Sequence, residues 1–446
     1  MINYPASTRF LVLGLGLSGQ ACVRFLKHLG YTVSANDSRA AFALTDIDSQ
    51  VHISWDGFDP DLLKQTDVLV VSPGIDLRDP MVQQAYQRDL PVIGEIELFA
   101  QAVTQPVIGI TGSNGKSTVT TLVGELLSAA GYRVAVGGNL GTPALTLLLQ
   151  SMDSEAPDIF VLELSSFQLD TTNSLSLAVA SVLNVSEDHQ DRYASYDDYV
   201  ASKASIFAHA AVAVINLDDK AVTDMPLPAQ AEVIGFSLQP QHRVSRCWVI
   251  NDHQLVNPDT AELIPVSTVK ILGQHNLANV LAALAIVSSY QVSTATAADV
   301  LAHFGGLDHR VQIVAEHNNV TWINDSKATN VGATLAAIRG LQQSVILLAG
   351  GVGKGADFTP LRCVADRVKQ ALLFGQDARR MDQVLGDVMR TQQVADLHQA
   401  VQLAAAQAQA GDIVLLSPAC ASLDQYPNYQ ARGEYFVQQV HEVIAA

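Results

Sequence analysis

Short runs of apolar and β-branched residues alternate with longer amphipathic segments along this 446-residue chain, and no other feature constrains the fold as much. Such runs predict β-strands, and the segments between them predict helices. Strands that alternate with helices are typical of parallel sheets covered by helices, so the predicted fold class is α/β. The predicted strands span residues 10–13, 31–35, 68–71, 107–110, 159–162, 179–183, 212–215, 320–323, 345–348, 371–374 and 413–416.

Two joints divide this alternation and predict three domains. One joint lies at residues 101–106, between a helical run and a new strand, and the other lies at Gly305 and Gly306. Three domains fit the length of the chain. We expect them at residues 1–101, 102–306 and 307–446. Residues 247–265, which contain two polar turns, predict a β-hairpin that departs locally from the α/β pattern.

The chain is acidic but carries few charged residues in total. Its formal net charge is −18, so its surface repels phosphate backbones, and we expect no nucleic-acid partner. Charged residues make up 16% and hydrophobic residues 48%, a balance that excludes a disordered chain. The longest apolar stretch, at residues 277–287, is too short to cross a membrane. No cysteine belongs to a Cys-x-x-Cys pair, which predicts free thiols and a cytoplasmic protein without membrane insertion.

Residues 111–118, Thr-Gly-Ser-Asn-Gly-Lys-Ser-Thr, stand between a predicted strand and a predicted helix. This is the position of a P-loop, whose glycines turn backbone N–H groups towards phosphate oxygens at a helix N-terminus. Lys116 would neutralise the phosphates of a nucleotide, and the Ser117 hydroxyl would bind Mg²⁺. A strict P-loop has its first glycine where this chain has Ile110, so the segment is a variant. The alternative is a glycine-rich turn that only starts a helix.

Two further glycine clusters follow predicted strands. Residues 14–19, Gly-Leu-Gly-Leu-Ser-Gly, match the pattern of a dinucleotide-binding turn, and Asp37 ends the next strand where a ribose-binding acid would stand. The pattern alone favours NAD, although a purely structural turn also satisfies it. Residues 350–355, Gly-Gly-Val-Gly-Lys-Gly, would either hold an anion beside Lys354 or form only a tight exit from the strand.

Polar side chains follow two strands of the predicted central domain. Glu163 ends one strand in the manner of an acid that holds Mg²⁺ beside a P-loop. Residues 184–193, Asn-Val-Ser-Glu-Asp-His-Gln-Asp-Arg-Tyr, follow the other strand and carry more polar groups than a turn requires. His189 in this segment is therefore a candidate functional residue. Lys203, taken alone, is expected to be a solvated surface lysine.

Six segments in one order carry a resemblance to a known family. They are the P-loop segment, ELSSFQL at 163–169, NVSEDHQDRY at 184–193, GQHNLAN at 273–279, NDSKATN at 324–330 and SPACASLDQYPNY at 417–429. Together they resemble the ATP-dependent Mur ligases of peptidoglycan synthesis, which serve cell-wall biogenesis, cell shape and cell division, and the likeness covers essentially the whole chain. It implies three α/β domains: a Rossmann-like N-terminal domain, a P-loop ATPase-like central domain and a Rossmann-like C-terminal domain.

The likeness is greatest to the members of this family that add D-glutamate to UDP-N-acetylmuramoyl-L-alanine. It implies an amide ligase that uses ATP and two Mg²⁺ ions and passes through an acyl phosphate. The turn at residues 14–19 would then hold UDP rather than NAD. The partners would be these small molecules, and the enzyme would work as a cytoplasmic monomer.

The resemblance also implies roles for individual residues. The catalytic residues would be Lys116, His189 and Lys203. ATP would bind Gly112, Ser113, Asn114, Gly115, Lys116, Ser117, Thr118, Asn276, Asn279, Arg310 and Asp325. One Mg²⁺ ion would bind Ser117 and Glu163, and the second would bind His189 and a carbamylated Lys203. The UDP-linked substrate would contact Leu17, Ser18, Asp37, Ser38, Arg39, Ser72, Gly74 and Asn139. D-Glutamate would contact Thr329, Lys354, Ser422, Leu423 and Tyr429, and Lys327 lies in the phosphate-side motif of the same domain.

The chain departs from the family pattern in three places. The loop between His189 and Lys203 is one residue shorter than usual, Val352 stands where an acid is common, and Tyr429 replaces a phenylalanine. Three other functions fit part of the sequence: a nucleotide switch without ligation, folylpolyglutamate synthase and an NAD-dependent dehydrogenase. The first would hydrolyse ATP without an acceptor amine. The second needs no complete domain before the P-loop, and the third leaves the P-loop without a role.

Overall fold

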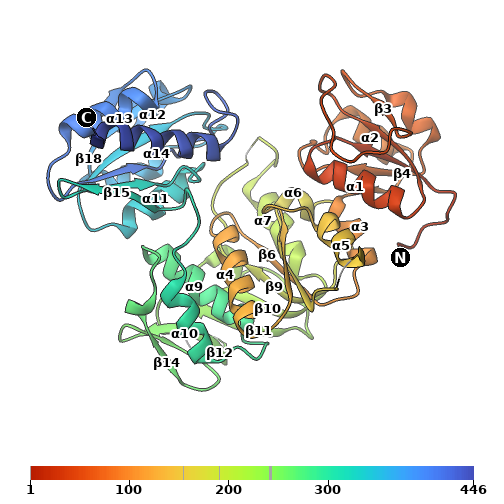
Figure 1. Cartoon of the computed structure of the whole chain (residues 1–446), viewed down its shortest axis with the longest axis horizontal. Helices are drawn as coiled ribbons and strands as arrows, with labels where there is room; N and C mark the ends of the chain where they lie inside the picture. Colours follow the sequence, from red (N-terminus) through yellow and green to blue (C-terminus); the bar gives the residue numbers. More distant parts are fainter. Residues whose placement is uncertain (1, 154, 190, 241–243, 446) are drawn as a thin grey trace.

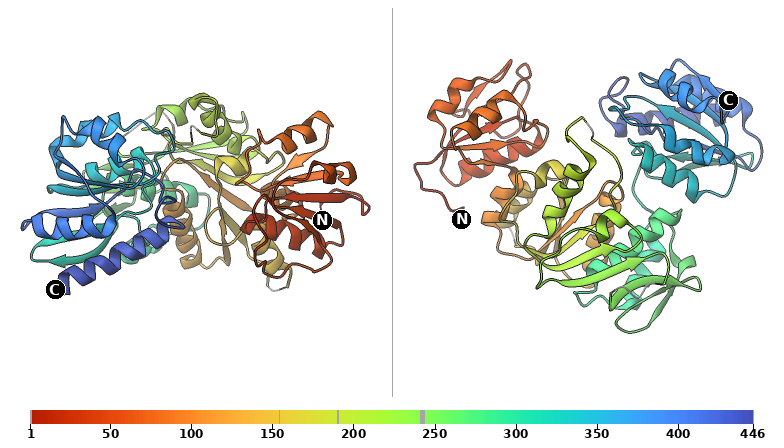
Figure 2. Two further views of the ribbon diagram at one scale, coloured as in Figure 1. Left: turned by 90° about the horizontal axis from the view of Figure 1, so that it is seen from above. Right: turned by 180° about the vertical axis from the view of Figure 1, so that it is seen from behind.

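The computed structural model describes residues 2–153, 155–189, 191–240 and 244–445, and it contains three sheets that follow one another along the chain. Figure 1 shows a unit built on each sheet, with the first and third units on opposite sides of the central one. The two further views show the same arrangement (Figure 2). The predicted α/β class with three units is therefore confirmed.

The first unit is built on an entirely parallel sheet. Its strands are β1 (Arg9–Leu13), β2 (Thr32–Asn36), β3 (His52–Ser54), β4 (Val68–Val71) and β5 (Val92–Ile93). Its helices are α1 (Leu17–His28), α2 (Pro80–Gln87), α3 (Glu95–Ala102) and the 3-10 helix η1 (Pro60–Gln65). The strand order β3-β2-β1-β4-β5 reverses between β1 and β4, which is the doubly wound arrangement of a Rossmann-like domain.

The central unit has the largest sheet. Its strands are β6 (Val107–Thr111), β7 (Val134–Gly138), β8 (Ile159–Glu163), β9 (Leu177–Val182), β10 (Ala210–Asn216), β11 (Glu232–Ser237), β12 (Arg246–Asn251), β13 (Gln254–Val256) and β14 (Leu263–Pro265). Its helices are α4 (Lys116–Ala129), α5 (Ala144–Asp153), α6 (Ser166–Leu169), α7 (Tyr196–Ala204), α8 (Lys220–Thr223), α9 (Gln274–Val287), α10 (Thr294–His303), η2 (Ser205–Phe207) and η3 (Val266–Thr268). The strand order is β14-β13-β12-β11-β10-β9-β6-β8-β7, so β6 lies between β8 and β9.

The third unit has a mixed sheet. Its strands are β15 (Gln312–His317), β16 (Val320–Asn324), β17 (Val345–Gly350), β18 (Val368–Phe374), β19 (Thr391–Gln393) and β20 (Ile413–Leu416). Its helices are α11 (Val331–Gly340), α12 (Ala378–Leu385), α13 (Leu397–Gln407), α14 (Tyr429–Ala445) and η4 (Thr359–Arg367). The order is β15-β16-β20-β17-β18-β19, and only the edge strand β15 pairs in an antiparallel direction.

Each predicted strand overlaps an observed one, but the prediction missed several strands. The missed strands are β3, β5, β7, β11, β15 and β19. Most of them are very short, polar or interrupted by glycine, so no apolar run marks them in the sequence. They lie in the sheets because neighbouring strands supply the hydrogen-bonding partners.

The prediction of a local hairpin at residues 247–265 was only partly right. These residues form β12, β13 and β14, and β12 pairs in parallel with β11, so the segment continues the central sheet. Cys247 and Trp248 of β12 are buried, and the Trp248 indole N–H donates to the Ser288 hydroxyl at 2.7 Å, just after α9. The segment stays with the sheet because its apolar side chains pack beneath that helix.

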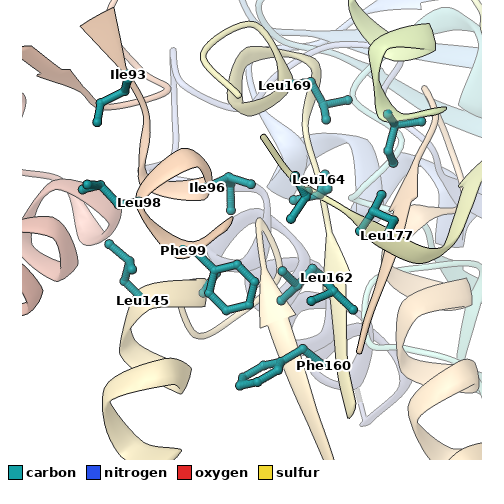
Figure 3. Packing of buried hydrophobic residues seen from close by; sticks show 14 of the residues in the cluster. Ile93, Ile96, Leu98, Phe99, Leu145, Phe160, Leu162, Leu164, Leu169 and Leu177 are labelled. Atoms are coloured by element: carbon teal, nitrogen blue, oxygen red, sulfur yellow. The ribbon is translucent and has the colours of Figure 1, made fainter. Parts of the chain in front are cut away.

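One hydrophobic core joins the first and central units. Helix α3 places Phe99 edge-on against Phe160 of β8, with ring centroids 5.3 Å apart. Figure 3 shows the two rings among Ile96, Leu145 and Leu162, all of which are fully buried. Burial of each such side chain stabilises the packed state by about 1.5–3 kcal/mol. The first unit is therefore held against the central one by packing like that inside a domain.

The third unit meets the central one where α11 passes α9. A Cβ atom on Gly340 would lie 3.0 Å from the Gly273 Cα, so the two backbones approach closely at this point. At the other end of α11, the Asn330 side-chain amide donates to the Asn114 side-chain oxygen at 3.2 Å, which brings the third unit to the P-loop. Among the described residues, no helix combines the length and the apolar composition that a membrane span requires.

Candidate active site

A cavity of about 390 Å³ lies where the central and third units meet. The segments that follow β6, β8 and β9 all reach it, which is the usual place for a ligand site in a parallel sheet. Many residues predicted from the sequence line this cavity together: Ser113, Asn114, Gly115, Lys116, Ser117, Thr118, Asn139, Glu163, His189, Lys203, Asn276, Asn279, Arg310, Asp325, Lys327, Thr329 and Lys354.

Basic side chains outnumber carboxylates in the cavity, although the chain as a whole is acidic. Its basic side chains are Lys116, Lys203, Arg310, Lys327 and Lys354. Its carboxylates, among the described residues, are Glu163, Asp188 and Asp325. An excess of positive groups in a partly enclosed cavity favours anions such as phosphates. The local charge therefore supports the predicted nucleotide site. The net charge of the whole chain, which is negative, would not support it.

The P-loop has the backbone that its glycines predict. Gly112 and Gly115 have φ angles of +153° and +86°, which favour glycine, and a Cβ on Gly115 would lie 2.3 Å from the Asn279 side-chain oxygen. Lys116 begins α4, and its ammonium donates to the carbonyls of Gly112 and Ser113 at 2.7 and 3.0 Å. The lysine thus bends back over the loop, where its charge faces the space that a phosphate would take.

Glu163 lies at the centre of a buried hydrogen-bond cluster. Its carboxylate accepts from the Ser117 hydroxyl at 2.5 Å and from the Asn139 amide at 2.6 Å. Arg310 of the third unit donates to the same Ser117 hydroxyl at 2.6 Å. Burial disfavours the charged form of Glu163, but the Lys116 charge and these hydrogen bonds outweigh it, so its pKa is lowered. An ionised carboxylate beside a hydroxyl is a suitable pair of ligands for Mg²⁺.

Lys203 contradicts the expectation of a solvated lysine. Its side chain is 1% exposed, because α7 packs with this residue facing the P-loop. Its ammonium donates to the Gly112 carbonyl at 3.1 Å and lies 4.5 Å from the centroid of the Tyr199 ring. Burial, and next the charge of Lys116, lower the pKa of Lys203 well below its usual value. The Lys203 ammonium is therefore more easily neutralised than that of an exposed lysine.

His189 lines the same cavity and has a left-handed backbone, with φ at +57°. Its ring packs edge-on against Phe167 with centroids 4.7 Å apart. Burial lowers the pKa of His189 to about 4, against the opposing effect of Asp188. The imidazole is therefore neutral at pH 7, which is the form that binds metal ions.

Asn276 and Asn279, which the resemblance assigns to ATP, lie on one face of α9 and line the cavity. The Asn279 amide donates to the Asn276 side-chain oxygen at 3.1 Å, and the Asn276 amide donates to the Leu272 carbonyl at 2.7 Å. The sequence analysis missed His275 in the same segment. It lines the cavity, and burial lowers its pKa to about 4, although a hydrogen bond to the Ala336 backbone opposes this shift.

Asp325 lies at the end of β16 and is almost fully buried. Its carboxylate accepts from the Ser417 hydroxyl at 2.8 Å and from the Val311 N–H at 3.3 Å. Burial raises the pKa of Asp325 to about 7, more than these hydrogen bonds lower it. Asp325 is thus held within the third unit at the edge of the cavity.

The predicted amino-acid residues are only partly brought together. Thr329 and Lys354 line the cavity, whereas Ser422, Leu423 and Tyr429 are not part of its lining. Ser422 is buried, and Leu423 is 70% exposed. The Tyr429 ring reaches the site through Lys327, whose ammonium lies 4.2 Å from the ring centroid. Burial lowers the pKa of Lys327 to about 7, with a further contribution from Arg310.

Sequence reasoning also missed two residues that connect the units at this cavity. Asp188 of the central unit accepts from the Lys354 ammonium at 2.9 Å and from the Asn330 amide at 3.1 Å. Both Asp188 and Asn330 lie inside motifs that were recognised, at residues 184–193 and 324–330. The sequence could have indicated them only through their positions next to His189 and Thr329. Their hydrogen-bonding partners lie more than a hundred residues away in the chain, so no local pattern predicts these contacts.

The glycine turn of the first unit is closely packed. Gly14 has a φ of +85°, and a Cβ on Gly19 would lie 1.9 Å from the Gly14 carbonyl oxygen. The Ser72 hydroxyl donates to that same carbonyl at 2.6 Å. Of the residues predicted to bind the UDP-linked substrate, Asn139 is part of the cavity lining. Those in the first unit lie outside the lining: Leu17, Ser18, Asp37, Ser38, Arg39, Ser72 and Gly74.

Asp37 directly follows β2 and is held by hydrogen bonds within the first unit. Its carboxylate accepts from the Arg39 guanidinium at 2.8 and 2.7 Å and from the Leu15 N–H at 2.6 Å. The Arg39 hydrogen bond lowers the pKa of Asp37 to about 2. Both oxygens of Asp37 are thus engaged within the first unit, by Arg39 and by the Leu15 backbone.

Arg192 links the first unit to the loop that carries His189. Its guanidinium donates to the Ile75 carbonyl at 2.8 Å, next to the predicted UDP-side residues Ser72 and Gly74. The same guanidinium lies over the Phe167 ring, 4.3 Å from the centroid. The loop after β9 therefore touches the first unit through Arg192 and the third unit through Asp188.

Family models match all three units of this chain. The Mur ligase middle domain matches residues 110–287, and the MurD-like N-terminal domain of Mur ligases matches residues 8–94. The Mur ligase glutamate ligase domain matches residues 309–420.

Solved structures share the fold. A pseudomurein peptide ligase type C from Methanothermus fervidus is 17% identical with a TM-score of 0.64, and covers 98% of this chain and 100% of its own. UDP-N-acetylmuramate-alanine ligase MurC from Thermotoga maritima is 15% identical with a TM-score of 0.60, covering 97% and 99%.

Relatives at much higher identity extend over the full chain. UDP-N-acetylmuramoylalanine–D-glutamate ligase of Nitrosococcus oceani is 43% identical, and the match covers 100% of this chain and 100% of the relative. The protein of the same name from Pseudomonas savastanoi pv. phaseolicola is 45% identical, over 97% of this chain and 98% of the relative. Identity at this level over whole chains, together with the three domain matches, shows that this chain belongs to the Mur ligase family.

Proposed function

We propose that this chain is the ATP-dependent ligase that adds D-glutamate to UDP-N-acetylmuramoyl-L-alanine in peptidoglycan synthesis. The observation that carries the proposal is the cavity in which Lys116, Glu163, Lys203 and Lys354 converge from two units. Relatives over the whole chain are named for this reaction. A cationic cavity beside a P-loop suits a reaction in which anionic groups meet at every step.

The steps of the proposed reaction explain why the cavity needs positive charge. A carboxylate oxygen of the UDP-linked substrate attacks the γ-phosphorus of ATP, the bond from that phosphorus to the bridging oxygen breaks, and ADP leaves. The amine of D-glutamate then attacks the acyl carbon, and the bond to the phosphate oxygen breaks. Phosphate leaves, and the nitrogen loses a proton. Lys116 and Arg310 would stabilise the negative oxygens, and closure around the cavity would keep water from the acyl phosphate.

The residues present fit Mg²⁺, which the Mur ligase family implies. Ser117 and Glu163 offer a hydroxyl and an ionised carboxylate, and Mg²⁺ commonly takes one or two carboxylates together with substrate phosphates. Among the described residues, no three His, Cys, Asp or Glu side chains converge as a metal-binding group, which agrees with a site that the nucleotide completes. An ion there would supply positive charge to the phosphates.

A second Mg²⁺ ion would be held by His189 and by Lys203 after carbamylation. An ammonium cannot bind a cation, but a carbamate can. The ammonium would first lose a proton, and the neutral Lys203 nitrogen would then form a bond to the carbon of CO₂ and lose a second proton, so the charge changes from positive to negative. The lowered pKa of Lys203 supports this step, because only the neutral amine attacks CO₂.

The remaining assignments follow the same family pattern. The P-loop, Asn276, Asn279, Arg310 and Asp325 would bind ATP, and Asn139 with the first unit would bind the UDP-linked substrate. Thr329 and Lys354 would meet D-glutamate at the cavity, with Ser422, Leu423 and Tyr429 completing the pocket when the substrate is bound.

The proposal extends to the organisation of the molecule. We place the three domains at residues 1–101, 102–306 and 307–446. Each of these ranges contains one sheet. A monomer would suffice, since one chain supplies every proposed contact. We place the enzyme in the cytoplasm, where ATP is available.

The test is ADP release by the purified protein with ATP, Mg²⁺ and UDP-N-acetylmuramoyl-L-alanine, measured with and without D-glutamate. We expect release that depends on both substrates and matches amide formation mole for mole. Release that ignores D-glutamate would instead support a nucleotide switch. Use of a folate acceptor in place of the UDP-linked substrate would support folylpolyglutamate synthase.

A further inference from the structure

An ion pair between two units closes one side of the cavity. The Asp188 carboxylate of the central unit accepts from the Lys354 ammonium of the third unit at 2.9 Å. The Asp188 side chain is 10% exposed and that of Lys354 is 22% exposed, so both charges are largely removed from water. The Asn330 amide, from the N-terminal end of α11, donates to the second oxygen of Asp188 at 3.1 Å.

The other two carboxylates of the cavity, among the described residues, are already engaged. Glu163 accepts from Ser117 and Asn139, beside the P-loop lysine. Asp325 accepts from Ser417 and a backbone N–H within its own unit. Asp188 is the carboxylate whose partner is a cation proposed to bind the incoming amino acid.

An amino acid presents a positive and a negative group on the same carbon atom. An isolated Asp–Lys pair offers the complementary negative and positive groups. Resting on the proposed ligase function, we propose that the Asp188–Lys354 pair opens to receive the amino acid, with Asp188 binding its ammonium group and Lys354 binding a carboxylate. One buried ion pair is then exchanged for two, so neither Asp188 nor Lys354 loses a charged partner.

This exchange predicts selection for the ammonium group itself. A ligand with both carboxylates of glutamate but no ammonium group would take Lys354 away from Asp188 and leave that carboxylate with Asn330 as its side-chain donor. Removing one partner of a buried ion pair is costly. Glutarate is such a ligand, since it has the carbon chain and both carboxylates of glutamate.

Asp188 also contacts His189, so a purely positioning role has to be separated from substrate binding. The Asp188 carboxylate accepts from the His189 backbone N–H at 2.9 Å, and its other oxygen lies 3.6 Å from the His189 ring nitrogen. If Asp188 acted only through His189, its replacement would change the dependence on Mg²⁺ and ATP. It would change D-glutamate and glutarate binding equally.

The experiment uses Asp188→Asn in the full chain, with Asp191→Asn as the matched control from an exposed position in the same loop. The KM for D-glutamate and the inhibition constant of glutarate against D-glutamate are measured, together with the KM values for ATP, Mg²⁺ and UDP-N-acetylmuramoyl-L-alanine. We expect Asp188→Asn to raise the KM for D-glutamate at least tenfold. Glutarate should bind as well as before or better, and the other three KM values should change less than twofold. Asp191→Asn should resemble the unaltered protein.

Equal weakening of D-glutamate and glutarate, or a main effect on Mg²⁺ or ATP, would overturn the proposal. If Asp188→Asn is too slow to assay or does not fold, the proposal is tested by ligand binding to the unaltered protein. Glutarate and 2-hydroxyglutarate should each bind it at least tenfold more weakly than D-glutamate, and equal affinities would overturn the proposal. Failure of the proposed function has a different signature, because the unaltered protein would then release no ADP in response to D-glutamate.

Discussion

Lys116 and Lys203 donate to the same acceptor, the carbonyl oxygen of Gly112, at 2.7 and 3.1 Å. Two lysines that come from different helices thus meet at the first turn of the P-loop. The Lys116 charge is one cause of the lowered pKa of Lys203, after burial. A buried lysine that is easily neutralised, beside a loop built for phosphate, is the arrangement that the proposed carbamate needs.

The first prediction concerns this lysine. Lys203→Ala should reduce ligase activity at least about 100-fold, because a negative metal ligand is lost. Added acetate or another short carboxylate should restore part of the activity by taking the vacant position. The measurement is ADP release across a carboxylate series, with Lys220→Ala as the control, since Lys220 forms an exposed ion pair with Asp224. Unchanged activity of Lys203→Ala would exclude the role.

Lys116→Ala should abolish ligation while the protein stays folded. The ammonium donates to two carbonyls of its own loop, so its loss removes charge at the phosphates and these two hydrogen bonds within the loop. We expect a fall in kcat of about 100- to 1,000-fold or more, as for loss of a preorganised charge stabiliser. Circular dichroism and ADP release together test this, and near-normal release from a folded variant would refute the P-loop assignment.

Gly19→Ala should weaken the first unit. The new Cβ would lie 1.9 Å from the Gly14 carbonyl oxygen, and the backbone would have to move at a cost of about 1–3 kcal/mol. Gly16→Ala is the matched control from the same turn, because nothing beyond its own chain neighbours lies within 4 Å of its new Cβ. Thermal unfolding should show a lower midpoint for Gly19→Ala than for Gly16→Ala. Equal midpoints would mean that the turn is not close-packed.

His275 should contribute to loss of stability in acid. Its pKa is near 6.5 when unfolded and about 4 when folded, so between these values the unfolded chain binds a proton that the folded chain does not. Stability therefore falls as the pH drops from about 6.5 to 4, by about 3 kcal/mol at most from this group. His275→Gln cannot take up that proton, and its thermal midpoint should fall less than that of the unaltered protein over this range. Parallel curves would contradict the prediction.

Among the substrates, Lys354→Ala should act mainly on the amino acid. The KM for D-glutamate should rise at least tenfold, since a fixed positive charge is lost. The KM for ATP should stay nearly constant, because Lys116 and Arg310 remain at the phosphates. The unaltered enzyme should prefer D-glutamate strongly over D-glutamine, L-glutamate and D-alanine. Comparable turnover with D-alanine would show that the pocket has been assigned to the wrong residues.

Most of the fold was predictable because strands and helices leave local patterns. The apolar runs at residues 107–110 and 159–162 became β6 and β8, and the P-loop glycines took the positive φ angles that the motif requires. Short polar strands such as β3 and β19 left no such pattern. Residues 247–265 were misjudged because the polar turns are visible in the sequence, but the pairing of β12 with β11 is not.

The segments that carry phosphate-binding and acidic groups could be read from the amino-acid sequence, because those motifs depend on neighbouring residues. How the groups meet depends on the folding of the whole chain. Lys203 is buried because α7 packs against the P-loop, and Arg310 reaches Ser117 across 193 residues of chain. The Asp188–Lys354 pair exists only where two units touch. Burial and long-range pairing set the charges of these side chains. Both depend on packing between segments that lie far apart in the sequence, and no local sequence pattern indicates that those segments touch.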